Sequence, residues 1–226
     1  MNARSKLSGA HGDQAGLPRG RSSLAPAEAR EAQRRRLVRA AISAFAERGY
    51  AATTISDIVG RARVARQVFY ELYASKEDCF LDAEAFGRQA LLGVLAPLAS
   101  AAAQAPDRDA WLRIPLRAYL HTCVEEREFA RAWAVEFPNA GPRTLAMRNS
   151  FFVTLAQLLR QGHERALELA PQCWQAVPPK CYEAAVGGAF ELVYHCLCEQ
   201  RYEDLPGLED DIVAFLARVL GYRRPD

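Results

Sequence analysis

The sequence predicts an all-α protein of about nine helices, and three observations support this fold class. Apolar residues recur at spacings of three and four along most of the chain, which is the period of one helical face. No stretch alternates apolar and polar residues between turn residues, as half-buried strands do. Breaks rich in proline and glycine, as at 138–142 and 205–207, separate the helical stretches. With 226 residues, 50% of them hydrophobic, one or two domains with a sizeable core are expected.

The first 28 residues are predicted to form a flexible basic arm. They are rich in Gly, Ser, Pro, Ala and Arg and show no helical period. Nine Lys or Arg precede residue 40 against three acidic residues, although the formal net charge of the whole chain is only +2. Such local positive charge suits phosphate. The segment is therefore either a plain disordered tail or an arm that touches DNA.

Residues 29–80 predict a helix-turn-helix domain. Its first helix places an apolar stripe on one face and stops at Gly49. The next begins at Thr54, with Asp57 three residues later in the pattern of a capping box. After a break at 63–64 a third helix follows, and Ser75 caps a fourth. In a helix-turn-helix the second of the paired helices lies in the DNA major groove.

Residues 52–78, ATTISDIVGRARVARQVFYELYASKED, resemble the N-terminal domain of the tetracycline-repressor (TetR) family of bacterial transcription regulators. The positions that match the family pattern are Thr53, Thr54, Ile58, Ala62, Val64, Phe69, Tyr70, Tyr73, Ser75, Lys76 and Glu77. The resemblance implies a DNA-binding head followed, at residues 81–226, by a helical domain that dimerises and binds an effector.

Three positions depart from the family pattern. Arg63 stands where the family has a turn glycine, and a left-handed backbone there would cost on the order of 1 kcal/mol. Ala65 replaces the serine that caps the recognition helix, a loss of roughly 1 kcal/mol. Leu72 replaces the usual histidine. We expect these changes to alter which operator is recognised while leaving the fold intact.

Side-chain chemistry assigns roles within the head. Arg66 and Gln67 open the recognition helix and suit guanine and adenine edges, respectively. The Tyr70 hydroxyl lies one turn later and can reach a phosphate. The remaining candidates are expected to contact phosphate through hydroxyls, charge or a helix start. The predicted DNA-binding residues are Thr53, Thr54, Arg61, Arg63, Arg66, Gln67, Tyr70 and Lys76.

The larger domain is expected to supply a dimer interface and a ligand pocket. For the interface, the last two helices are predicted to contribute Tyr182, Val186, Phe190, Val193, Leu197, Ile212, Phe215, Leu216 and Val219, with Gly187-Gly188 allowing close packing. For the pocket, the candidates are Trp111, Tyr119, His121, Trp133, Phe137, Phe151, Phe152, Phe190 and Tyr194. The competing interpretation is that both sets are ordinary core.

No membrane span, metal or cofactor is expected. No apolar run approaches the ~18 residues of a span, and the N-terminus lacks the apolar core of a signal peptide. A cytoplasmic location with reduced cysteines follows. Neighbouring helical residues point in different directions, so His195, Cys196 and Cys198 do not converge on a metal.

The sequence thus favours a homodimeric regulator, a repressor that a small molecule releases from a near-palindromic operator in double-stranded DNA. One alternative is an activator or partner-controlled regulator without a small-molecule effector. The other is an all-α cytoplasmic enzyme, although no phosphate-binding loop, H-E-x-x-H motif or grouped catalytic residues are seen.

Overall fold

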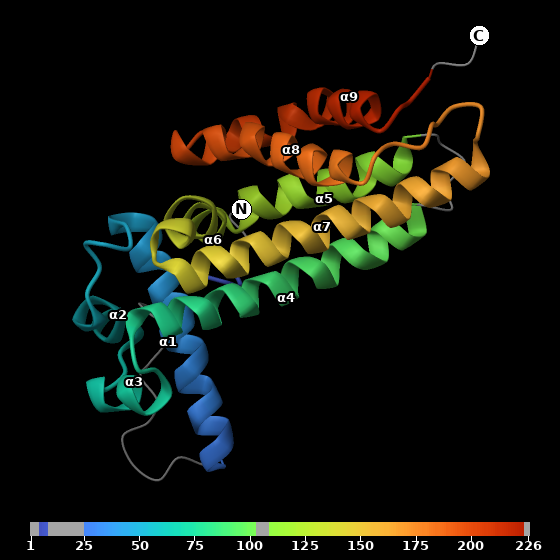
Figure 1. Cartoon of the computed structure of the whole chain (residues 1–226). Coiled ribbons are helices and arrows are strands. Elements are labelled where there is room, and N and C mark those ends of the chain that lie inside the picture. Colours follow the sequence, from blue (N-terminus) through green and yellow to red (C-terminus); the bar gives the residue numbers. More distant parts are fainter. Residues whose placement is uncertain (1–4, 9–24, 103–108, 224–226) are drawn as a thin grey trace. The chain divides into compact units, whose positions relative to one another are not determined.

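The computed structural model describes residues 5–8, 25–102 and 109–223, and within these it has nine α-helices and no strand (Figure 1). The predicted all-α class is confirmed. The helices are α1 (Pro26–Arg48), α2 (Ile55–Ala62), α3 (Arg66–Leu72), α4 (Lys76–Ala102), α5 (Ala110–Glu125), α6 (Arg127–Arg131), α7 (Pro142–Leu169), α8 (Lys180–Cys198) and α9 (Glu209–Val219). A π-helical turn (Ala132–Glu136) and two 3₁₀ segments (Phe137–Asn139 and Tyr202–Leu208) join them.

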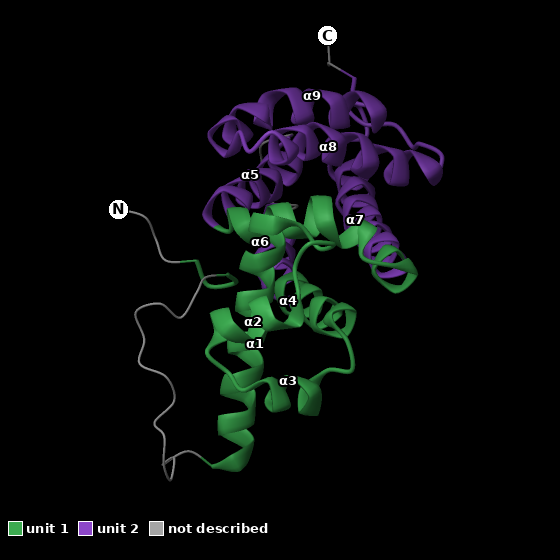
Figure 2. Ribbon diagram, turned by 90° about the vertical axis from the view of Figure 1, so that its left-hand side faces the viewer, with its two compact units in different colours: residues 1–88, 126–145 green, residues 89–125, 146–226 purple. Residues whose placement is uncertain are grey.

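The chain divides into two compact units (Figure 2). Unit 1 comprises residues 1–88 and 126–145, and unit 2 comprises residues 89–125 and 146–226. Helices α4 and α7 each contribute residues to both. Unit 1 therefore includes residues 81–88 and 126–145, which the sequence analysis placed in the effector domain.

The core of unit 1 forms where α1 meets α4 and the segment after α6. Phe45 of α1 is fully buried, and its ring centroid lies 4.3 Å from that of Phe80. Phe80 in turn meets Phe137 edge-on at 4.9 Å. Such aromatic pairs add about 0.5–1.5 kcal/mol each beyond their buried area. Residues 126–145 thus contribute to the core that supports the helix-turn-helix.

Residues 5–8 of the predicted arm are packed on unit 1. The Leu7 side chain is only 5% exposed. The Glu126 carboxylate accepts hydrogen bonds from the amides of Lys6 and Leu7 at 2.7 and 3.1 Å, and Arg39 donates to the carbonyls of Ser5 and Ser8 at 2.8 and 2.7 Å. The expectation of a flexible arm is wrong for these four residues, and also for residues 26–28, which belong to α1. The rest of the arm up to residue 24, apart from them, lies outside the described residues.

Unit 2 is held together by an aromatic cluster around His163, which is fully buried on α7. The Trp111 ring stacks on the His163 ring, with centroids 6.0 Å apart, and Trp174 meets both edge-on. His163 Nδ1 shares a 3.0 Å hydrogen bond with the Tyr182 hydroxyl. Because burial disfavours the imidazolium, it lowers the pKa of His163 below its usual value.

The buried histidine predicts acid sensitivity of unit 2. An unfolded histidine titrates near pH 6.5. Since the native pKa is lower, its contribution is fully present above about pH 6.5 and is lost as pH falls below it, at up to about 1.4 kcal/mol per pH unit. Urea unfolding between pH 8 and 5 should show this slope, and His163→Phe should flatten it. His121→Gln, at an exposed site, is the control and should retain the slope.

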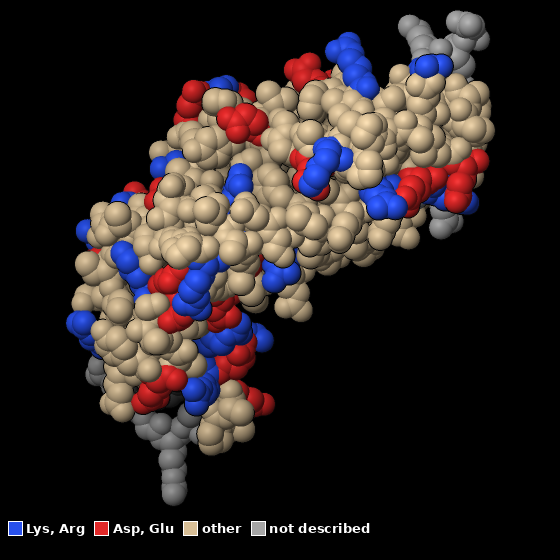
Figure 3. Space-filling model, viewed as in Figure 1, with Lys and Arg blue, Asp and Glu red and all other residues tan. Residues whose placement is uncertain are grey.

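From the sequence no apolar run long enough to span a membrane is expected, and helix α4 corrects that expectation. Among the described residues it is the helix that is long and apolar enough to cross a membrane by length and composition, with 17% of the qualifying window buried. Its last part, residues 89–102, has no charged side chain, and Figure 3 shows few charges there. Leu91 and Leu95 of this stretch line a cavity inside unit 2, which accounts for apolar side chains on that face.

Candidate nucleic-acid interface and effector cavity

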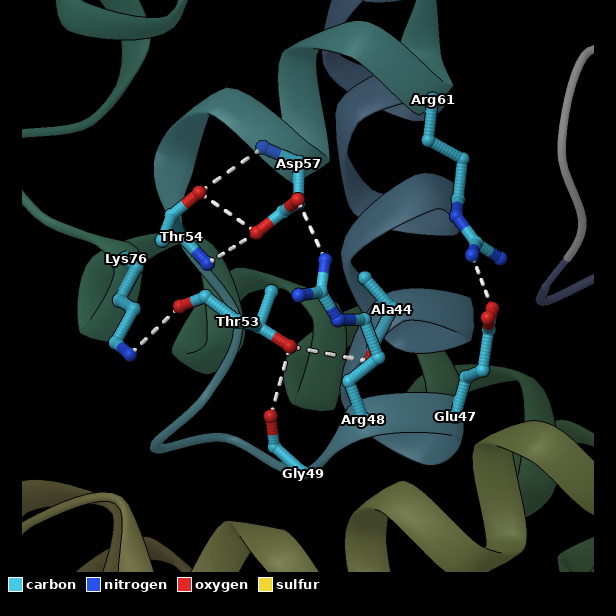
Figure 4. A network of polar contacts seen from close by, with 9 residues as sticks. All are labelled: Ala44, Glu47, Arg48, Gly49, Thr53, Thr54, Asp57, Arg61 and Lys76. Atoms are coloured by element: carbon cyan, nitrogen blue, oxygen red, sulfur yellow. Dashed lines mark hydrogen bonds and ion pairs between the residues drawn. The ribbon is translucent and has the colours of Figure 1, made fainter.

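The entry into α2 is a complete capping box. The Thr54 hydroxyl accepts from the Asp57 amide at 3.2 Å, and the Asp57 carboxylate accepts from the Thr54 amide at 2.8 Å. Arg48 of α1 adds an ion pair with Asp57 at 2.6 Å (Figure 4). The hydrogen bonds from Thr54, with a smaller contribution from Arg48, lower the pKa of Asp57 to about 2. The predicted start of α2 is confirmed, and the capping box provides acceptors for the amides of Thr54 and Asp57.

The turn after α2 places Arg63 in the left-handed region, with φ 52° and ψ 45°. This is the conformation for which the family pattern uses glycine. The side chain is exposed. Its charge also opposes that of the buried Arg36, whose pKa is lowered by burial first and by Arg63 second.

Arg63→Gly is expected to raise the free energy of unfolding by about 1 kcal/mol, because glycine adopts this backbone without steric cost. Urea denaturation measures the change. Arg63→Ala is the matched control: it removes the same side chain but keeps the unfavourable backbone, so it should give no such gain. Equal stabilisation by both substitutions would show that charge repulsion, not backbone strain, is relieved.

Helix α3 begins without a side-chain cap. Ala65 occupies the N-cap position with φ −65° and ψ 142°, and it makes no side-chain hydrogen bond. A seven-residue helix has few internal hydrogen bonds to compensate.

Ala65→Ser should therefore stabilise α3 by roughly 1 kcal/mol, since the serine hydroxyl can accept from an amide of the first turn. The melting temperature should rise. Ala51→Ser, at an exposed position in the turn between α1 and α2, is the control and should leave the melting temperature unchanged. A melting temperature unaffected by Ala65→Ser would mean that these amides have another partner.

One face of α3 is available to a ligand. Phe69 is fully buried, whereas Arg66, Gln67 and Tyr70 are exposed, Tyr70 by 50%. Arg66 donates to the Tyr70 hydroxyl at 3.2 Å, with its guanidinium carbon 5.7 Å from that ring's centroid. These contacts are long and open to solvent, so they orient the arginine without consuming its five donors.

Two predicted phosphate contacts are instead used inside the fold. The Thr53 side chain is 1% exposed, and its hydroxyl donates to the carbonyls of Ala44 and Gly49 at 3.1 and 2.7 Å. The Lys76 ammonium donates to the carbonyls of Tyr50 and Thr53 at 2.6 and 2.9 Å (Figure 4). Both side chains hold the turn that joins α1 to α2. The sequence interpretation was wrong in aiming the Thr53 hydroxyl at DNA.

The other basic candidates lie within the helix-turn-helix. Arg61 forms an ion pair with Glu47 of α1, and the Arg63 side chain is exposed to solvent at the turn after α2. Thr54 is also exposed, although its hydroxyl serves the capping box. Of the eight predicted residues, Arg66, Gln67 and Tyr70 thus form the open face of α3.

Unit 2 contains a cavity of about 460 Å³ between α4, α5, α7, α8 and α9. Leucine is the commonest residue of its walls, and the leucines include Leu91, Leu95, Leu155 and Leu158. The size falls within the range of about 300–1,000 Å³ that is typical of small-molecule sites. These leucines were not among the predicted pocket residues, and the charge-free stretch 89–102 is the signal that could have identified Leu91 and Leu95.

Three of the nine predicted pocket residues line this cavity, namely Trp111, Tyr119 and Phe190. His121 is exposed at the protein surface. Phe137 and Trp133 are buried in unit 1. Phe151, Phe152 and Tyr194 lie in unit 2 but do not line the cavity. For these six the prediction was wrong, because aromatic residues in helices are more often packed in a core than placed around a ligand.

The predicted interface residues are mostly core of unit 2. Six are buried within a single chain: Tyr182, Phe190, Val193, Leu197, Ile212 and Leu216. Val186, Phe215 and Val219 are partly exposed. A Cβ atom on Gly188 would lie 2.6 Å from Phe215, so this glycine brings α9 close to α8 within the chain. Gly187 faces open space, on the side of α8 that also carries the exposed Ala184 and His195.

In the described part of the chain no group of three His, Cys, Asp or Glu residues could hold a metal ion. The six cysteines are free thiols.

The comparisons with known proteins agree with this geometry. Residues 37–83 match the family model described as bacterial regulatory proteins, tetR family. The fatty acid degradation regulator FadR from Bacillus halodurans is 19% identical, with 80% of this chain and 96% of that chain covered and a TM-score of 0.68. FadR from Bacillus subtilis, solved in complex with stearoyl-CoA, is 16% identical over 80% and 96% of the two chains, with a TM-score of 0.65.

A bacterial regulatory protein in the tetR family from Rhodococcus RHA1 is 22% identical, with 85% and 98% of the chains covered and a TM-score of 0.65. No curated protein matches the chain. At these identities the likeness to solved structures shows a shared fold.

Proposed function

Because this chain is a transcriptional regulator of the TetR family, we propose that α3 reads its operator through Arg66, Gln67 and Tyr70. The observation that carries the proposal is the open face of α3, where these three side chains are exposed while Phe69 anchors the helix. Arginine suits guanine and glutamine suits adenine in the major groove. Thr54, Arg61 and Arg63 would contact the flanking phosphates.

The working form would be a homodimer that reads a near-palindrome in double-stranded DNA. A single seven-residue recognition helix contacts few base pairs, whereas two heads related by a two-fold axis read two half-sites about one helical turn apart. The open side of α8, around Ala184, Gly187 and His195, supports a helix-to-helix interface because Gly187 allows close approach of a partner. The protein would act by binding rather than catalysis, in the cytoplasm where its operator lies.

The cavity in unit 2 would bind a small apolar effector. Two proteins of the same fold are fatty acid regulators, and one was solved with stearoyl-CoA. An effector that prefers a conformation with another head spacing would lower operator affinity by population shift, as in a repressor released by its ligand. Activation, or control by a protein partner without a small molecule, is the alternative, and it predicts that no cavity ligand changes operator affinity.

A footprint on the DNA upstream of the protein's own coding sequence, at near-physiological salt, tests the proposal. Protection of two half-sites one turn apart is the expected result. If no site is protected there, selection from random DNA extends the search, and failure of both would overturn DNA reading by α3. Arg35→Ala, at an exposed ion pair on α1, should footprint like the wild type.

A further inference from the structure

We infer that the cavity holds an elongated aliphatic chain whose carboxylate head lies beside Arg165. This inference rests on the effector role proposed above and specifies the chemistry of that ligand. Three features of unit 2 support it: an elongated space, a difference in polarity between its two ends, and a single charged side chain at the polar end.

The cavity is elongated. On α4 it extends from Leu91 to Ser100, which is ~13 Å at the rise of an α-helix, and on α7 from Leu155 to Arg165, ~15 Å. Apolar side chains line most of this length, so the space suits an elongated apolar ligand.

The polar side chains of the lining gather at one end. The Trp111 ring packs on α7 at Gly162, where an added Cβ would lie 2.7 Å from the indole, so the start of α5 meets the part of α7 that carries Gln161 and Arg165. Since α4 ends at Ala102 and α5 begins at Ala110, Ser100 belongs to the same end.

The opposite end is apolar. Leu91 and Leu155 form its walls together with Tyr119. The Tyr119 hydroxyl is hydrogen-bonded to Cys123 of the same helix, and burial raises the pKa of Tyr119 well above its usual value. That hydroxyl is therefore neutral and already partnered. This end suits the tail of the ligand.

The polar end has the donors for a carboxylate. Ser100 and Gln161 line this end, and their hydroxyl and amide groups can donate hydrogen bonds. Of the described residues that line the cavity, Arg165 alone is charged. It contacts Glu168 at 2.6 Å through one nitrogen, which leaves further guanidinium donors for an anion.

Titration calorimetry on the full-length protein with dodecanoate, dodecan-1-ol and dodecyltrimethylammonium tests the head group. Dodecanoate should bind most tightly. Arg165→Gln should weaken dodecanoate at least tenfold and leave dodecan-1-ol unchanged. Arg160→Gln is the matched control, because Arg160 has an equivalent exposed ion pair on α7 with Glu164 but does not line the cavity. Lengthening the acid from eight carbons should tighten binding about fourfold per methylene until the cavity is filled.

Equal binding of the three head groups, or equal losses in Arg165→Gln and Arg160→Gln, would overturn the assignment of the head. Tighter binding of dodecanoyl-coenzyme A than of dodecanoate would do the same. Failure of all straight-chain probes would overturn the chain itself. Operator release is read separately by fluorescence anisotropy. If dodecanoate binds but does not release DNA, the effector role is contradicted and the inferred ligand class stands. If an unrelated compound releases DNA and dodecanoate does not bind, the effector role stands and the inferred ligand class is contradicted.

Discussion

Replacing Arg66 with alanine is expected to abolish selective operator binding while leaving the fold intact. Each good bidentate contact between arginine and guanine discriminates by about 1–3 kcal/mol, and a dimer loses two of them, so operator affinity should fall about 10³-fold. The cost to folding should be small. Arg66 is exposed at the first position of α3, and its hydrogen bonds to Ser56 and Tyr70 are long, at 3.3 and 3.2 Å.

Fluorescence anisotropy on the footprinted site and on random DNA, at one salt concentration, measures the effect. The loss should be confined to the operator, and the melting temperature should stay that of the wild type. Arg35→Ala removes an exposed arginine of α1 and should change neither affinity. A uniform loss on both DNAs would reassign Arg66 to phosphate, and unchanged operator affinity would remove it from the interface.

Lys76→Met is expected to destabilise the head by about 2 kcal/mol, because hydrogen bonds to a charged group are worth about 1.5–3 kcal/mol and water can replace part of them. The ammonium donates to Tyr50 and Thr53 at 2.6 and 2.9 Å and lies 4.2 Å from the Tyr50 ring centroid. Methionine keeps the aliphatic stem but supplies no donor to these carbonyls.

Urea denaturation measures this change, with Lys180→Met as the control. The Lys180 side chain is 84% exposed and, within the described residues, forms its ion pair with Glu183 three residues away, so its loss should cost under about 0.5 kcal/mol. The salt dependence of DNA binding separates the two roles of Lys76. A phosphate contact would lower the salt slope by about one unit at unchanged stability, which would contradict the structural role.

Features that depend on residues close in the chain could be predicted from the sequence. The capping box of Thr54 and Asp57 joins residues three apart, and the structure has it with the expected hydrogen bonds. The left-handed backbone of Arg63 and the missing cap at Ala65 were expected from the family resemblance, and the structure has both beside helix ends. Likewise the burial of Phe69 and the exposure of Arg66 follow from the period of one short helix.

Features that depend on contacts between distant segments could not be predicted from the sequence. Lys76 is a polar residue of a DNA-binding motif, yet it donates to the main-chain carbonyl of Tyr50, 26 residues away. Thr53 likewise donates to the carbonyl of Ala44 on α1, 9 residues away. The sequence gives no reason to prefer Trp111 over Trp133 as a pocket residue. In the structure Trp133 is buried in unit 1, whereas Trp111 lines the cavity of unit 2. Tyr182 could equally meet a partner subunit or His163, and the structure places it against His163.

The sequence by itself therefore determined the helical class, the capped start of α2 and the residues on the open face of α3, because caps, turns and helical period act over three or four residues. Only the tertiary structure decided which polar side chains form hydrogen bonds inside the fold. It also decided which apolar side chains line the cavity and which pack in a core. Those outcomes depend on which distant segments meet, and the hydrophobic effect that drives them is non-directional, so composition alone does not specify the partner.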